Sequence, residues 1–288
     1  MPNNLPNRVV LIAGPTASGK SAIAIEMARA ENGVIINADS MQIYAEMRVL
    51  TARPSEAEQA MAEHRLYGHV AAAESYSVGR WRNEALAAIK AAHETGKLPI
   101  LVGGTGLYFM SILKGLAEVP EIKPEVRQHW RSFTGDLHSE LFSRDPISAA
   151  KLHASDRQRL IRALEVVDST GHRLAHWQQV AEAHAPLTGY KVQKLFKSVD
   201  RETLYARADT RFDQMLEQGA LDEVRALPPL EPAAPLMKAI GVPELLAHLK
   251  GELTLDEARR LAHIATRQYI KRQLTWWRGQ MADWEMAP

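Results

Sequence analysis

The chain of 288 residues contains no cysteine. This absence excludes disulfide bonds and thiolate-bound metal sites, and it fits a reducing compartment. The chain also lacks a run of ~18 uninterrupted apolar residues, which a membrane-spanning helix needs. Its start, Met1-Pro2-Asn3-Asn4, lacks the charged residue and apolar stretch of a secretion signal. We therefore expect a cytoplasmic protein that does not enter a membrane.

A large excess of charge of one sign is missing as well. The formal net charge is +1, so a polyanion would have to be bound by locally clustered basic residues rather than by an overall field. Hydrophobic residues make up 46% of the chain and charged residues 24%, as in globular proteins rather than disordered ones. The length allows one large α/β domain and a smaller one.

What the chain does contain, near its start, is the phosphate-binding pattern G-x-x-x-x-G-K-[ST]. An apolar segment, 8–13, reads as a buried strand before it, and 22–29 reads as a helix after it. Such a loop surrounds an anion with backbone N–H groups and a positive helix end, while Lys20 adds charge and the Ser21 hydroxyl is placed for Mg²⁺. The pattern predicts a di- or triphosphate site formed by Gly14, Pro15, Thr16, Ala17, Ser18, Gly19, Lys20 and Ser21.

Further apolar segments alternate with helical ones and read as strands at 33–38, 98–102 and 192–199. Alternating strands and helices predict an α/β fold with a doubly wound parallel sheet, whose ligands bind beyond the carboxyl ends of the strands. The first three strand ends deliver the phosphate loop, the segment Asp39-Ser40-Met41-Gln42 and the segment 103–108. We expect these three segments to converge on one site.

The middle of the chain has a different character. From about Gly115, three prolines separate short helical segments rich in Arg, His and Trp. We interpret 115–195 as an all-helical domain inserted into a P-loop core formed by 1–114 and 196–288, with helices at the C-terminal end.

Two strand ends carry side chains suited to chemistry. Asp39 could coordinate a metal, orient water or accept a proton, or it could simply cap a helix. Gly103 and Gly104 suit the close approach of a phosphate, to which Thr105 would offer a hydroxyl, although an ordinary tight turn has the same composition. The third strand lacks the terminal carboxylate that holds metal in P-loop nucleotidases, which disfavours an ATPase.

Basic residues form two clusters. In the helical segment 256–278, one face carries Arg260, Arg267, Lys271 and Arg278, and the opposite face carries Ala258, Ala262, Ala265, Tyr269 and Trp276. In the insertion, Ser155 and Gln158 fit a capping box, after which Arg159 and Arg162 can point together at a nucleic-acid backbone or base. Each cluster fits either an RNA contact or a solvated surface.

The segments GPTASGKS, NADSMQIY, TARP, GGTGLY, QRLIRALEV and KRQLTWWR occur in that order. Together they resemble the bacterial tRNA dimethylallyltransferase, or tRNA isopentenyltransferase, family. The resemblance implies transfer of a dimethylallyl group from its diphosphate to the exocyclic amine of the adenine immediately 3′ of the tRNA anticodon. It implies that the phosphate loop holds dimethylallyl diphosphate rather than ATP, that Mg²⁺ assists, and that the insertion grips the anticodon stem-loop of a tRNA bound by a monomer.

The resemblance also implies residue roles. Asp39 would be the general base and Thr105 would lie near the bridging oxygen of the leaving diphosphate. Lys20, an Mg²⁺ ion on Ser21, and Arg207 or Arg211 would neutralise the diphosphate. Positions that match tRNA contacts of the family are Asp39, Ser40, Met41, Gln42, Thr105, Arg127, Gln158, Arg159, Arg162, Lys271, Arg272, Gln273 and Arg278.

The chain departs from the family pattern in two places. Lys238 to Pro243 lacks an aromatic and a basic residue of Arg-x-x-Gly-Tyr-Lys/Arg, and Gly68 stands where many members have Asp. The zinc finger of eukaryotic relatives is absent. Two other functions fit the motifs: a P-loop kinase of a small metabolite with Asp39 as base, and a non-catalytic nucleotide-dependent RNA-binding protein. An isopentenyltransferase acting on free AMP is disfavoured by the long basic C-terminal portion.

Overall fold

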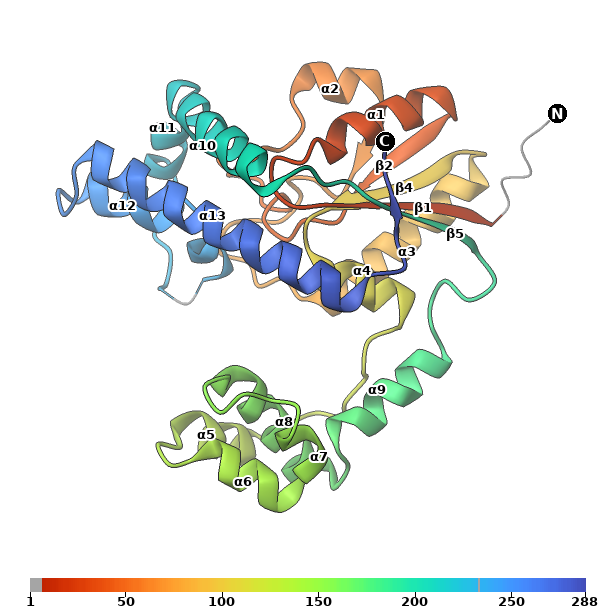
Figure 1. Cartoon of the computed structure of the whole chain (residues 1–288), viewed down its shortest axis with the longest axis vertical. Coiled ribbons are helices and arrows are strands. Elements are labelled where there is room, and N and C mark those ends of the chain that lie inside the picture. The colour runs from red at the N-terminus through yellow and green to blue at the C-terminus, as the bar shows by residue number, and fades with distance from the viewer. Residues whose placement is uncertain (1–6, 233) are drawn as a thin grey trace. The chain divides into compact units, whose positions relative to one another are not determined.

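A computed structural model describes residues 7–232 and 234–288, which form two compact units (Figure 1). The core unit comprises 7–109 and 189–288, and the insertion unit comprises 110–188. The sheet resumes at Lys191, so the boundary at 195/196 suggested by the sequence falls inside a strand. Residues 191–196 pair in register with the first strand, which holds them in the core unit.

All strands of the core sheet are parallel and follow the order β3-β2-β4-β1-β5-β6. Their bounds are β1 Arg8–Ala13, β2 Gly33–Asn37, β3 Glu63–Arg65, β4 Leu98–Gly103, β5 Lys191–Phe196 and β6 Glu285–Met286. Strands β2 and β4 are buried along their whole length and β1 from Val9 onward, as expected when helices cover both faces of a parallel sheet.

Helices pack on both faces of this sheet, which confirms the doubly wound α/β class (Figure 1). Helix α1, Lys20–Ala30, buries Ala24, Ile25 and Ala28 against β1, β2 and β4. On the opposite face, α3, Val78–Glu94, places the Trp81 indole 2.8 Å from the Asn37 carbonyl oxygen, to which it donates. Two further helices of this part of the chain are α2 Glu56–Met61 and α4 Gly106–Leu113.

A second hydrophobic cluster joins the C-terminal helices to the loop that follows β2. It includes Met47 and Leu50 from that loop, Phe212 from α10 and Ala262 from α13. The elements are α10 Arg201–Glu217, α11 Ala220–Arg225, the 3-10 helix η1 Pro235–Lys238, α12 Val242–Leu249 and α13 Leu255–Gln280.

Helix α13 is rotated relative to the face that the sequence predicted. Its buried positions are Ala258, Ala262, Thr266, Ile270, Gln273 and Trp277. Ala265, Tyr269 and Trp276, which we expected to be innermost, are only partly buried. The rotation brings two polar side chains, Thr266 and Gln273, to the inside of the core unit.

The insertion unit has a small core of its own, in which Trp130, Leu141 and Leu160 are fully buried. Its helices are α5 Pro124–Ser132, α6 Leu137–Arg144, α7 Pro146–Ala149, α8 Arg157–Thr170 and α9 Leu174–Ala183. The cap of α8 is Asp156, which accepts the Arg159 N–H, so the predicted capping box of Ser155 and Gln158 was wrong. Within 7–232 and 234–288, no helix is long and apolar enough to cross a membrane.

Candidate active site

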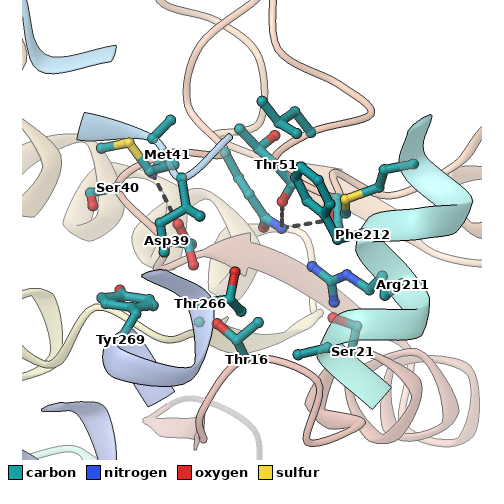
Figure 2. A pocket seen from close by; sticks show the side chains of 18 of the residues that line it. Thr16, Ser21, Asp39, Ser40, Met41, Thr51, Arg211, Phe212, Thr266 and Tyr269 are labelled. Carbon is teal, nitrogen blue, oxygen red and sulfur yellow. Dashed lines mark hydrogen bonds between the residues drawn. The ribbon is translucent and has the colours of Figure 1, made fainter. Parts of the chain in front are cut away.

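A cavity of about 400 Å³ lies in the core unit at the carboxyl end of its sheet. Figure 2 shows side chains from four elements around it: the phosphate loop, the segment after β2, α10 and α13. The predicted site residues that line it are Thr16, Lys20, Ser21, Asp39, Ser40, Met41, Gln42, Arg211 and Arg272. The expected convergence of the β1 and β2 ends is therefore confirmed, and Val102 and Gly103 bring the end of β4 to the same cavity.

The phosphate loop is shaped by close packing and by two left-handed residues. A Cβ at Gly14 would lie 2.3 Å from the Lys197 carbonyl oxygen, and Ala17 and Gly19 have φ angles of 64° and 87°. Helix α1 then begins at Lys20, so its first N–H groups lack partners within the helix. The Ser18 hydroxyl is buried without a hydrogen-bond partner among the described residues. These donors suit an anion.

Lys20, Arg211 and Asp39 interact electrostatically inside the cavity. Burial lowers the pKa of Lys20 to about 8, an effect that Asp39 opposes and Arg211 strengthens. Burial likewise lowers the pKa of Arg211, with Asp39 and Glu58 opposing it. The Lys20 ammonium donates to the Pro15 carbonyl at 3.3 Å. An arriving diphosphate would therefore find positive charge that the protein has only partly compensated.

The structure separates the two candidate arginines of α10. Arg211 lines the cavity, whereas Arg207 is exposed and is not among the lining residues. Packing of α10 against α13 fixes which of the two faces inward. We therefore retain Arg211 and drop Arg207 from the candidate catalytic set.

The side chain of Asn37, which we did not predict to be part of the site, forms hydrogen bonds with both the N–H and the carbonyl oxygen of Asp39. The fully buried Asn37 accepts the Asp39 N–H at 2.8 Å and donates to the carbonyl oxygens of Asp39 and Leu66 at 2.9 and 3.0 Å. Oδ1 of Asp39 accepts the Met41 N–H at 2.9 Å, and turns rather than a helix follow, so the helix-cap alternative was wrong. The sequence feature that could have identified Asn37 is a polar residue at the end of an otherwise apolar strand.

Two other predicted residues connect loops at the edge of the cavity. The Thr105 hydroxyl accepts the Ser40 N–H at 3.0 Å and donates to the Ser40 hydroxyl at 3.3 Å, and Thr105 is not among the lining residues. The Gln42 amide donates to the Thr51 and Ala52 carbonyls at 2.9 and 2.8 Å. These side chains shape the segments that carry the site.

The glycines at the end of β4 and in the segment after it make room for other parts of the chain. A Cβ at Gly103 would lie 2.0 Å from the Ala38 carbonyl oxygen, and one at Gly106 would lie 2.1 Å from the Trp276 ring. We expected a phosphate to approach these glycines closely; in the structure, the residues that approach them closely belong to the end of β2 and to α13.

The basic face of α13 is exposed at Arg260, Arg267, Lys271 and Arg278. Arg267 forms an ion pair with Asp209. Gln273 differs from its neighbours: it is 6% exposed, and its amide is bonded inside the core unit, not directed outward as a tRNA contact requires.

In the insertion unit the predicted contacts are accessible to different degrees. Arg127, Gln158 and Arg159 are exposed. Arg162 is partly buried, and its guanidinium lies 3.9 Å from the carboxylate of the buried Glu165.

The sequence profile of the family described as IPP transferase matches residues 42–280. The chain belongs to this family. It is 51% identical to the tRNA dimethylallyltransferase of Rhodopseudomonas palustris (strain BisB18), over 98% of this chain and 91% of that protein. The resemblance drawn from the motifs is therefore confirmed.

Solved structures of IPP transferases agree with the fold. The full-length tRNA isopentenylpyrophosphate transferase of Bacillus halodurans is similar with a TM-score of 0.70 and 33% identity, over 98% of this chain and 89% of that one. A eukaryotic dimethylallyltransferase acting on tRNA is similar with a TM-score of 0.82 and 29% identity, over 94% of this chain and 70% of that one.

One departure of this IPP transferase from the family pattern has a steric explanation. Gly68 has a φ of 56°, and a Cβ there would lie 1.4 Å from Nη1 of Arg53. The Arg53 guanidinium, which donates to the Tyr44 carbonyl oxygen, occupies the space that a side chain at 68 would need. In the other departure, Lys238 lines the cavity, a contribution that we did not predict.

Two tyrosines of this IPP transferase also line the cavity without having been predicted there. Burial and the negative charge of Asp39 raise the pKa values of Tyr67 and Tyr269, so both phenols stay neutral.

Whether the cavity suits Mg²⁺ depends on the oxygen ligands that its side chains provide. In the described part of the chain, no three His, Asp or Glu side chains gather as a metal cluster. The Ser21 hydroxyl and the Asp39 carboxylate nevertheless line the same cavity. Mg²⁺ commonly binds through one or two protein oxygens, substrate phosphates and water. These residues therefore fit an ion that arrives with a diphosphate.

Proposed function

We infer that this chain is a tRNA dimethylallyltransferase. It transfers a dimethylallyl group from dimethylallyl diphosphate to the exocyclic amine of the adenine immediately 3′ of the tRNA anticodon and releases diphosphate. The chain is 51% identical to an enzyme of that name. The observation that best supports the reaction is that Lys20 and Arg211 line the same cavity as the carboxylate of Asp39.

The donor binds with its diphosphate at the phosphate loop. Backbone N–H groups at the start of α1, the Lys20 ammonium and the Arg211 guanidinium stabilise the negative charge that grows as the diphosphate leaves. Mg²⁺ held by Ser21 and the diphosphate oxygens would add positive charge. Leu50, Phe212 and Met215 offer an apolar wall to the dimethylallyl group. Because an allylic carbon tolerates positive charge, stabilising the leaving group lowers the barrier most.

The acceptor amine attacks the allylic carbon as the carbon–oxygen bond to the diphosphate breaks. A carbon–nitrogen bond forms, the amine loses a proton to Asp39, and the bonding electrons leave with the diphosphate. The adenine must first leave its stack to reach the cavity, which costs a few kcal/mol.

We propose that both units bind the tRNA. On α13 the contacts are Lys271, Arg272 and Arg278; after β2 they are Ser40 and Met41; in the insertion unit they are Arg127, Gln158, Arg159 and Arg162. The insertion unit would grip the anticodon arm. We further propose a cytoplasmic enzyme that acts as a monomer.

Nucleoside mass spectrometry tests this function. Unmodified tRNA is incubated with the protein, Mg²⁺ and dimethylallyl diphosphate, with free AMP as a competing acceptor. We expect a dimethylallyl mass gain on the adenosine beside the anticodon. A gain on AMP alone would contradict tRNA as the acceptor, and ATP turnover with a small acceptor would point to a kinase.

A further inference from the structure

The side chain of Gln273 joins three segments that are far apart in the sequence. Its Oε1 accepts the N–H of Thr16 in the phosphate loop at 3.0 Å, and its Nε2 donates to the Gly104 carbonyl oxygen after β4 at 3.1 Å. Both bonds lie within the core unit. The residue is 6% exposed, so water does not readily replace these bonds.

The surroundings of this amide are built for close contact. A Cβ at Gly104 would lie 2.6 Å from Nε2 of Gln273, and one turn of α13 later Trp276 fills the space above Gly106. Thr16 in turn lines the cavity. The first half of the phosphate loop is thus held on one side by the segment after β5, through Gly14 and Lys197, and on the other by α13.

We propose that Gln273 is a positioning residue for the diphosphate site, which fixes the phosphate loop in the conformation that binds the donor. This inference rests on the proposed function. An amide is needed because one side chain must offer an acceptor to Thr16 and a donor to Gly104. Lys271 and Arg278 on the same helix are exposed, so α13 serves the donor site with its buried face and tRNA with its exposed face.

The first test is Gln273→Met, which keeps the length of the side chain and removes both hydrogen bonds. We expect the KM for dimethylallyl diphosphate, and its Kd measured by calorimetry without tRNA, to rise about tenfold. The kcat and the Kd for tRNA should stay within about twofold. If the role of Gln273 were purely structural, the thermal midpoint and the active fraction would fall, but the donor KM and Kd would not change selectively relative to the kcat and the Kd for tRNA. The matched control is Gln268→Met, at an exposed position of the same helix, which should leave all four constants unchanged.

The second test leaves Gln273 in place. Gly104→Ala adds a Cβ that displaces the amide, so it should raise the same KM, and the two substitutions together should raise it by less than the product of their separate effects. This variant decides the question if Gln273→Met does not fold.

Two results would overturn the inference. One is an unchanged donor KM in both variants while the wild type modifies tRNA. The other is a selective loss of tRNA affinity in Gln273→Met, which would return the residue to the tRNA interface. If the wild type itself modified no tRNA, the proposed function would fail, whereas donor binding by calorimetry would still report on Gln273.

Discussion

Asp39 owes its orientation to the residue that ends β2. The Asn37 amide bonds the backbone of Asp39 on both sides, and the Met41 N–H fixes one carboxylate oxygen. The second oxygen, Oδ2, is the one that we expect to face the adenine amine. A base held in this way loses little entropy when the substrates arrive.

Replacement of this base should separate chemistry from binding. In Asp39→Asn, whose side chain has the same shape, we expect single-turnover transfer to slow by about 10²–10⁴-fold, the usual contribution of a general base. The Kd for tRNA, measured by filter binding, should change by less than about threefold, because the amide oxygen of asparagine can still accept a hydrogen bond from the adenine amine and the other tRNA contacts are unchanged. Proportionate losses of rate and affinity would refute the assignment of Asp39 as the base.

The pKa of Lys20 gives donor binding a pH dependence with a definite sign. The pKa is lowered to about 8 by burial, so Lys20 loses its proton above that pH in the free enzyme. A bound diphosphate favours the charged form, and binding above pH 8 must therefore take up a proton. By the same linkage, this lysine's contribution to the free energy of unfolding is least favourable below pH 8 and improves as the pH rises towards 10.5.

We therefore expect the Kd for dimethylallyl diphosphate to be flat between pH 7 and 8 and to rise by up to about tenfold per pH unit above pH 8. Calorimetry in buffers of different ionisation enthalpy would detect the proton taken up. Lys20→Ala should bind the donor more weakly and lose the dependence. Equal affinity from pH 7 to pH 9.5 in the wild type would show that Lys20 is not the titrating contact.

At the scale of an element, α13 has two functional faces. Lys271 and Arg278 are exposed, whereas Gln273 and Trp277 are buried.

Lys271→Ala should weaken tRNA binding and reduce the slope of log K against log salt by about one, because one phosphate contact is lost. The matched control is Lys90→Ala on α3, whose ammonium lies 3.9 Å from Glu94 and which we do not place at the tRNA. A salt slope equal to that of the wild type would remove Lys271 from the interface.

The sequence predicted the elements with a strong apolar pattern and missed those without one. Strand β1 and helix α1 lie where the phosphate-loop pattern placed them, because an apolar run and a glycine loop mark their ends. Strands β3 and β6 are three and two residues long and lack buried residues, so nothing in their composition distinguishes them from loops.

Side-chain direction was harder to predict than the elements. Arg207 and Arg211 are one helical turn apart, and only the packing of α10 decides which of them lines the cavity. Gln273 was grouped with the basic residues beside it, because sequence spacing does not show that a buried amide has two partners from distant segments. Hydrogen bonds of that kind depend on tertiary structure alone.

At the scale of the whole molecule, the core unit holds the cavity and every group proposed to act on the donor. The insertion unit has its own hydrophobic core and contributes only proposed tRNA contacts. We infer that cleavage of an allylic diphosphate in the core unit is coupled to alkylation of a tRNA adenine.

This coupling can be tested by the stoichiometry of the two products. Diphosphate released from dimethylallyl diphosphate and dimethylallyl-adenosine formed in tRNA are quantified in the same reaction, beside a tRNA without adenine at the position 3′ of the anticodon. We expect one diphosphate for each modified adenosine and no release above background with the altered tRNA. Diphosphate release that continues with the altered tRNA, or that leaves the tRNA unmodified, would contradict this coupling.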